Sequence, residues 1–175
     1  MTSFDQVAAS FWGTGGDDLL HDPLTDELVA EAEQLLGVAL PTDLLDLLRI
    51  RNGGVVADAW NAHPLGADKY VPFGHMVGIG LDPDVASMLN SPYLIHEEGL
   101  LPASTVVIDG DGHYWVTLDY RECGPAGECG PAGEPAVVRL HSDGACDERL
   151  ASDFRTFVEG LRPLAELAGS GRSVF

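Results

Sequence analysis

Residues 105–120 read TVVIDGDGHYWVTLDY, a pattern typical of a β-hairpin. Two runs rich in β-branched and aromatic residues flank a repeated Asp-Gly pair, which tolerates the positive φ angles of a tight turn. The second run alternates between two sets of side chains: Tyr114, Val116 and Leu118, and Trp115, Thr117 and Asp119. A third run, PAVVRLH at residues 135–141, follows a loop rich in Gly and Pro. The sequence therefore predicts an antiparallel meander of three strands.

Apolar residues spaced by three and four predict helices before this meander. A short helix is expected over residues 4–12, and a second helix follows the N-cap Thr25 and ends at Gly37. A third helix opens after Pro41 and ends at Asn52-Gly53-Gly54, which we interpret as a stop signal. In these two helices the side chains expected to be buried are Leu28, Ala32, Leu35, Leu36, Leu44, Leu45, Leu47, Leu48 and Ile50, while Asp43, Asp46 and Arg49 should be exposed.

Weaker patterns fill the remaining segments. Residues 55–60 and 70–79 are predicted as strands, residues 82–89 as a short helix and residues 92–98 as a further turn. A closing helix is predicted from its apolar face, formed by Leu150, Phe154, Phe157, Val158 and Leu161, and Pro163 interrupts or ends it. The order predicts an α+β fold, with the helices packed on one face of an antiparallel meander sheet.

The length of 175 residues fits one domain, 1–175. We expect a core at residues 24–161, an N-terminal helix and linker at 1–23, and a frayed tail at 164–175. No apolar run is long enough to span a membrane, and the first residues do not resemble a signal peptide. A cytoplasmic protein without membrane contact is the expectation.

The charge is strongly negative, because 28 Asp and Glu oppose 9 Lys and Arg for a net charge of −19. Such a field repels phosphate backbones, so direct nucleic-acid binding is disfavoured. It would attract a basic protein partner. The alternative is that the acidic surface serves only to keep the chain soluble, or reflects a host whose proteins are all acidic.

The three cysteines, Cys123, Cys129 and Cys146, lie in one region. Two of them belong to a tandem repeat, because residues 122–127 (ECGPAG) recur unchanged at 128–133. An odd number of cysteines in a reducing compartment makes a disulfide framework unexpected. Zinc binding by these cysteines and His141 is an alternative, although the spacing does not match a zinc knuckle. No cofactor and no metal are expected.

Catalytic motifs are absent: the chain has no nucleophile elbow, no phosphate-binding loop with its lysine and no H-E-x-x-H pair. Asp109 and Asp111, with His113 nearby, could ligate a divalent cation, but turn chemistry explains both carboxylates without one. We therefore expect a binding protein and not an enzyme.

Residues 24–54, LTDELVAEAEQLLGVALPTDLLDLLRIRNGG, resemble the N-terminal signature of the SUKH superfamily. The second half is similar to the strand block and closing helix of that family at Gly110–His113, Leu118–Arg121, Gly133–Val138, and at Leu150, Ala151, Phe154 and Phe157. The repeated ECGPAG loop is longer than the usual hairpin, and residues 55–90 match poorly. These two departures are where partner specificity is expected.

The resemblance implies an α+β binding module, typically a bacterial immunity protein that binds and neutralises a toxin domain, often a nuclease. The acidic side chains of this chain would mimic the phosphates that a basic nuclease cleft binds. The acids expected to face the partner are Glu97, Glu98, Asp109, Asp111 and Asp119. Trp115 and Tyr120 are expected to add contact area, and Arg121 is expected to bind a carboxylate, either of this chain or of the partner. Members of this set that are buried would instead hold the hairpin together. The alternative function is a regulatory or scaffolding module with an endogenous partner and no toxin.

Overall fold

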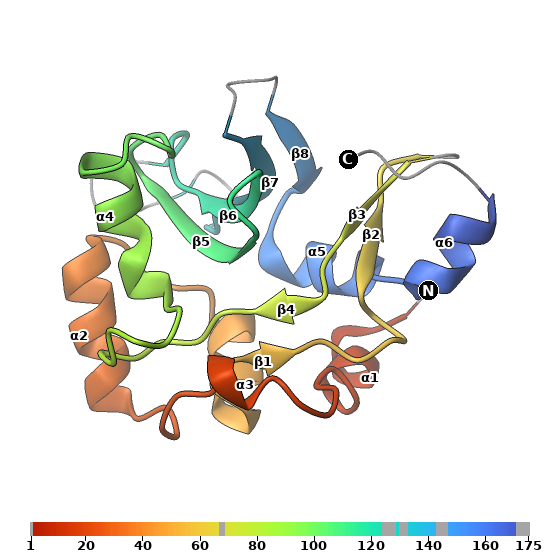
Figure 1. Cartoon of the computed structure of the whole chain (residues 1–175), viewed down its shortest axis with the longest axis horizontal. Helices are drawn as coiled ribbons and strands as arrows, with labels where there is room; N and C mark the ends of the chain where they lie inside the picture. The colour runs from red at the N-terminus through yellow and green to blue at the C-terminus, as the bar shows by residue number, and fades with distance from the viewer. Residues whose placement is uncertain (1, 67–68, 124–128, 130–132, 143–146, 171–175) are drawn as a thin grey trace.

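The computed structural model describes residues 2–66, 69–123, 129, 133–142 and 147–170. Its principal sheet has four antiparallel strands in chain order: β5 (Thr105–Gly110), β6 (Tyr114–Asp119), β7 (Ala136–His141) and β8 (Glu148–Ala151) (Figure 1). The predicted hairpin and third strand are confirmed, and with them the α+β class.

Strand β8 was not predicted, because Leu150 was assigned to the closing helix. That helix, α5 (Phe154–Gly160), begins only after Asp153, whose carboxylate accepts a hydrogen bond from the Thr156 amide at 2.7 Å. This N-cap ends the extended segment, so Leu150 pairs in the sheet. A four-residue strand next to a helix is too short to show its period in the sequence.

The helices of the first half follow their local signals. They are α1 (Phe4–Ala8), α2 (Asp26–Leu36) and α3 (Thr42–Ile50), with a short 3₁₀ turn, η1 (Asp17–Leu19), before α2. Thr25 caps α2 by accepting from the Leu28 amide, and Gly37 takes a φ of 71° at its end, as predicted. Residues 164–170, expected to be frayed, instead form α6 (Leu164–Ser170).

The middle of the chain is more irregular than predicted. Two small antiparallel pairs form there: β1 (Gly54–Val55) with β4 (His75–Met76), and β2 (Ala62–Pro64) with β3 (Tyr70–Pro72). The helix predicted at 82–89 is wrong. Ser87 is extended and its hydroxyl accepts from the amides of Gly80 and Leu89, so the helical part starts later, with η2 (Met88–Asn90) and α4 (Ser91–His96).

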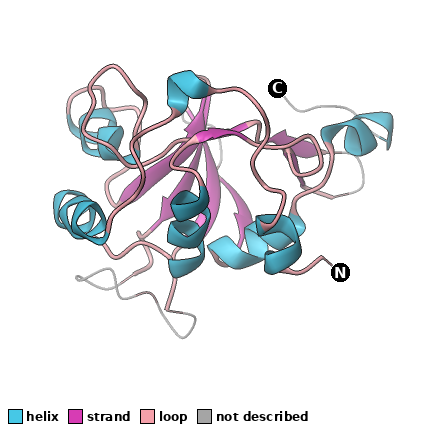
Figure 2. Ribbon diagram, turned by 90° about the horizontal axis from the view of Figure 1, so that it is seen from below, coloured by secondary structure: helices cyan, strands magenta, loops and turns pink. Residues whose placement is uncertain are grey.

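The principal sheet has two unequal faces. The inner face packs into the main core with α1, α2, α3 and α5, and Figure 2 shows the strands in the middle of the molecule with helices around them. The outer face carries a small apolar cluster of Leu101, Val107, Val138 and Leu140, against which Leu94 and Ile95 of α4 pack. One helix therefore lies on the face that was expected to be free of helices. The rest of the outer face carries the polar side chains described below.

Asn52 joins three distant segments of the chain. It is buried, and its side-chain amide donates to the Asp22 and Ile79 carbonyls, both at 2.8 Å. Its side-chain carbonyl accepts from the Ile79 amide at 2.9 Å, and its backbone carbonyl accepts from the His21 amide at 3.0 Å. α3 ends at Ile50, just before the predicted stop, and Gly53 has the positive φ expected of it, at 98°. Asn52 itself is a cross-link between distant segments.

We predict that Asn52→Ala lowers the free energy of unfolding by about 3 kcal/mol, because it leaves buried groups of Asp22 and Ile79 without their partner. Urea unfolding followed by circular dichroism measures the change. The matched control is Asn90→Ala at an exposed position, which should shift stability by less than about 0.5 kcal/mol. Equal effects of the two substitutions would contradict the role of Asn52.

Candidate functional site

The eight candidate residues do not gather in one place. Glu97 and Glu98 follow α4 and are exposed, and Glu98 accepts a hydrogen bond from the Tyr93 hydroxyl at 2.6 Å. This hydrogen bond raises the pKa of Tyr93. The two carboxylates form an exposed acidic end to α4.

Asp111 lies at the turn of the β5–β6 hairpin. Its carboxylate accepts from the His113 amide at 2.8 Å and from the Tyr114 amide at 3.2 Å. These are the bonds of an Asx turn, so the residue shapes the hairpin while its side chain stays exposed. The Asx turn is sufficient to explain the position of this carboxylate.

Asp109 and Tyr120 are buried and present no surface to a partner. The Tyr120 hydroxyl donates to the Ala39 carbonyl at 2.7 Å and ties the end of β6 to the segment between α2 and α3. Asp109 accepts from the Gly110 amide at 2.9 Å, and burial raises its pKa to about 7. Tyr120 therefore holds the hairpin in place, whereas Asp109 is a buried carboxylate with a hydrogen bond to the adjacent amide. Burial corrects the expected roles of Asp109 as a charge facing a partner and of Tyr120 as contact area.

Trp115 is half-buried on the outer face, where it packs against the small apolar cluster beside α4. Its ring lies so close over Gly110 that any larger side chain at that position would collide with it. Trp115 thus packs against its own chain and is only partly available to a partner.

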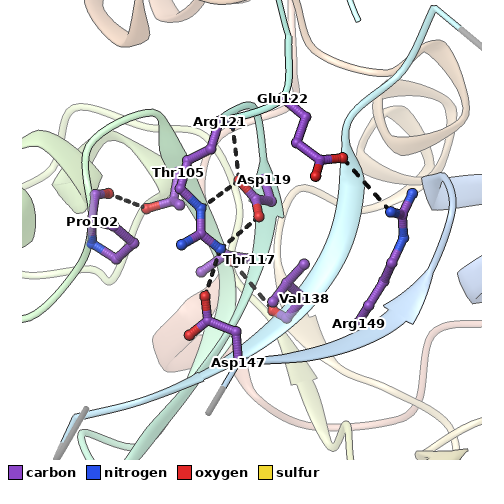
Figure 3. Close-up of polar contacts among 9 residues, drawn as sticks. All are labelled: Pro102, Thr105, Thr117, Asp119, Arg121, Glu122, Val138, Asp147 and Arg149. Carbon is purple, nitrogen blue, oxygen red and sulfur yellow. Dashed lines mark hydrogen bonds and ion pairs between the residues drawn. The ribbon is translucent and has the colours of Figure 1, made fainter. Parts of the chain in front are cut away.

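Asp119 and Arg121 lie together in a cleft of about 380 Å³ at the uncovered end of the outer face (Figure 3). Sheet register builds its floor, because Asp119 on β6 stands opposite Ala136, and Val138 on β7 stands opposite Arg149 on β8. The side chains that line the cleft are Asp119, Arg121, Glu122, Cys123, Cys129, Glu134, Ala136, Val138, Asp147, Arg149 and Ser152. We call it the sheet cleft.

Arg121 is the centre of the polar network in this cleft. Its guanidinium donates to both carboxylate oxygens of Asp119, at 2.9 and 2.7 Å, and to Asp147 at 2.7 Å. The hydrogen bonds to Asp119 are the main reason why the pKa of Arg121 is raised, so this cation stays charged. The intramolecular clamp that was one of the two roles expected of Arg121 is thus present, with Asp119 and Asp147 as its partners.

Acids exceed bases in the sheet cleft by four to two. Arg149 lies 3.8 Å from Glu122, a loose pair between two largely exposed side chains. Glu134 forms no ion pair with any described residue. Partial burial and the nearby charges of Asp43 and Asp153 raise its pKa, and the attraction of Arg155 offsets only part of this rise. The cleft therefore carries uncompensated negative charge.

Sequence reasoning missed most of this cleft. Arg149 lies on β8 and Asp147 directly precedes it, and the sequence pattern did not predict this strand. Glu122 and Glu134 bracket the duplicated segment, since the first repeat begins at Glu122 and the second ends at residue 133. These two acids at the ends of the duplicated segment were the feature of the sequence that could have indicated the cleft.

Cys123 and Cys129 are joined by a disulfide, so the expectation of no disulfide is wrong. The cause is local, because the duplication places a second cysteine six residues after the first and the two backbones meet in an antiparallel bridge. With both sulfurs bonded to each other, these residues offer no thiolate to zinc. Cys146 lies outside the described residues, and the described part of the chain holds no group of three or more metal-ligating side chains.

The family model described as "SMI1 / KNR4 family (SUKH-1)" matches residues 23–160. A search of curated proteins finds no match. Among the described residues, no helix is long and apolar enough to cross a membrane.

We predict that burial of Asp109 makes the protein less stable as the pH rises. The folded pKa of about 7 lies above the ordinary value of 3.8, so the stability that Asp109 contributes is complete below about pH 4 and lost as the pH rises through 7. Asp109→Asn should match the parent chain near pH 4 and exceed its unfolding free energy by on the order of 4 kcal/mol at pH 8. Urea titrations at both pH values measure this. Asp111→Asn removes the same charge at an exposed site, and a similar gain there would refute the role of burial.

We predict that reducing the disulfide lowers the unfolding free energy by about 2 kcal/mol, because the bridge restricts the unfolded chain over a short loop. Urea unfolding with and without a phosphine reductant measures the loss. A chain with Cys123→Ser and Cys129→Ser should start at the lower stability and not respond to reductant. The prediction fails if both proteins respond equally.

Proposed function

Because the chain belongs to the SMI1/KNR4 (SUKH-1) family, we propose that it acts by binding another protein, and that this partner is the toxin domain of a bacterial polymorphic toxin system. The chain is then an immunity protein that blocks the toxin by covering its active surface in a stoichiometric complex. No catalytic step is assigned to any of its residues.

The observation that carries this proposal is the sheet cleft. It lies at the end of the outer face that α4 leaves uncovered, and its lining is negatively charged. Nuclease active sites bind phosphates through Lys and Arg, so a basic groove is complementary to such a surface. The overall charge of −19 adds long-range attraction that speeds the encounter.

The residues of the cleft divide into fixed and available groups. Arg121 holds Asp119 and Asp147 in one geometry, and these carboxylates still have free lone pairs for a partner cation. Glu122 and Glu134 are the available acids, since one is in a loose pair and the other pairs with no described residue. A partner Lys or Arg near Glu134 would relieve its repulsion from Asp43 and Asp153.

The remaining exposed candidates act at longer range. Glu97 and Glu98 at the end of α4 and Asp111 at the hairpin turn strengthen the negative field that attracts a basic partner. Charges of this kind alter the association rate and its salt dependence more than the lifetime of the complex.

We predict that reversing charge in the sheet cleft disrupts the complex. The double variant Glu122→Lys/Glu134→Lys should bind the toxin domain that co-purifies with the parent chain at least about 100-fold more weakly, because it sets like charges against each other at close range. Titration calorimetry on the isolated toxin domain measures the affinity, and co-expression with the active toxin measures protection of the cells.

The matched control is Glu27→Lys/Glu31→Lys, which makes the same charge change at exposed positions on α2. This variant should lose only a few-fold in affinity, through the weaker overall field. Equal losses in both variants would reject the sheet cleft as the binding site. If co-expression of the parent chain gives no protection, the immunity function is rejected in favour of a regulatory or scaffolding role.

A further inference from the structure

Three large aliphatic side chains are exposed on a surface that has no part in the sheet cleft. Leu20 is 41% exposed, Ile50 62% and Leu81 61%. Ile50 is the one residue of the α3 apolar set that the helix leaves in solvent, contrary to its predicted burial. We call these three residues the Leu20 surface.

Two clefts bring these side chains together. One, of about 300 Å³, lies between Leu20, Leu28, Leu81 and Val85, and the other, of about 380 Å³, lies between Leu20, Leu48 and Ile50. Leu20 lines both, so the clefts adjoin on either side of it. Each has room for one large apolar side chain, and clusters of this kind mark interaction sites on protein surfaces.

The backbone beneath this surface is fixed. The residue after Leu20 is held by hydrogen bonds from the His21 amide to the Asn52 carbonyl and between His21 Nε2 and the Ala86 carbonyl, both at 3.0 Å. The segment before Leu81 is held where the Gly80 amide donates to Ser87 at 3.2 Å. The leucines are therefore presented to solvent by a rigid frame, which lowers the ordering cost of binding.

The charges around the Leu20 surface are negative. Asp22 and Asp82 line the first cleft, and in the described part of the chain neither pairs with a Lys or Arg. The two arginines that line the second cleft are neutralised within the chain. Arg49 pairs with Asp26 and Asp46, and Arg51 pairs with Asp17.

We propose that the Leu20 surface is a second protein-binding site, whose partner is an amphipathic basic helix. Two adjoining clefts accept two apolar side chains from one face of the partner, which a helix supplies at positions i and i+3 or i+4. The unpaired acids at the rim select Lys or Arg beside those apolar residues. This inference does not depend on the proposed function, since it concerns other residues of the chain.

A labelled 14-residue helical peptide of Leu and Lys tests the proposal, with fluorescence polarisation at 0.15 M salt as the readout. The full-length chain should bind it, and a peptide of equal charge with Ser in place of Leu should bind at least tenfold more weakly. The variant Leu20→Ser/Leu81→Ser should also bind the Leu/Lys peptide at least tenfold more weakly. It changes only exposed side chains, so folding is retained.

The matched control is Leu35→Ser/Leu100→Ser, which removes two exposed leucines that lie elsewhere, Leu35 on α2 and Leu100 after α4. Leu35 is 55% exposed, contrary to its predicted burial. Its affinity for the peptide should stay within twofold of the parent chain. The proposal is overturned if the two double variants lose affinity equally, or if the Ser/Lys peptide binds as well as the Leu/Lys peptide. Loss of peptide binding in Glu122→Lys/Glu134→Lys alone would also overturn it, by placing the peptide in the sheet cleft.

Discussion

The side-chain amide of Asn52 is the constraint on which the arrangement of the first half of the chain depends. Its three side-chain hydrogen bonds, with the Asp22 carbonyl and with both backbone groups of Ile79, join the segment before α2 to the segment that runs past the edge of β5. A buried amide is stable only when its donors and its acceptor are all paired, so these bonds form together or not at all. The neighbouring glycines are part of the same constraint, because a side chain at Gly53 or Gly78 would collide with the backbone of another segment.

The parts of the fold that the sequence predicts are those with local causes. The Thr25 cap and the Gly37 terminus each act within a few residues, and both have the predicted structure. The hairpin is also confirmed, but its turn is shorter than predicted, because Asp109 and Gly110 belong to β5 and, of the two glycines, only Gly112 has a positive φ, of 92°. Strand β8 and the exposure of Ile50 have no local cause, since they depend on which distant element packs against them. The disulfide is an intermediate case. Its two cysteines are close in sequence, so their pairing has a local cause, but the expectation that they are reduced rested on a reducing compartment and not on this spacing.

The same distinction separates the candidate residues of the site. Alternation along β6 puts Tyr120 in phase with Val116 and Leu118, so its burial could have been predicted from the period of two. Its hydrogen bond to Ala39 could not, because that partner lies 81 residues away. The pairing of Arg121 with Asp119 is local and was open to prediction as a clamp, whereas Asp147 enters the network only through the unpredicted β8.

The sheet cleft and the Leu20 surface use negative charge in different ways. In the sheet cleft, charge is the main feature, and Arg121 fixes the acids in place so that a cationic partner meets a prepared geometry. At the Leu20 surface, apolar area is the main feature, and the acids only restrict which apolar partners can approach. A net charge of −19 would attract any basic protein to either face, so the field alone cannot discriminate between partners. Discrimination must come from the short-range groups held rigidly on each face, the carboxylates around Arg121 on one and the leucines on the frame set by Asn52 on the other.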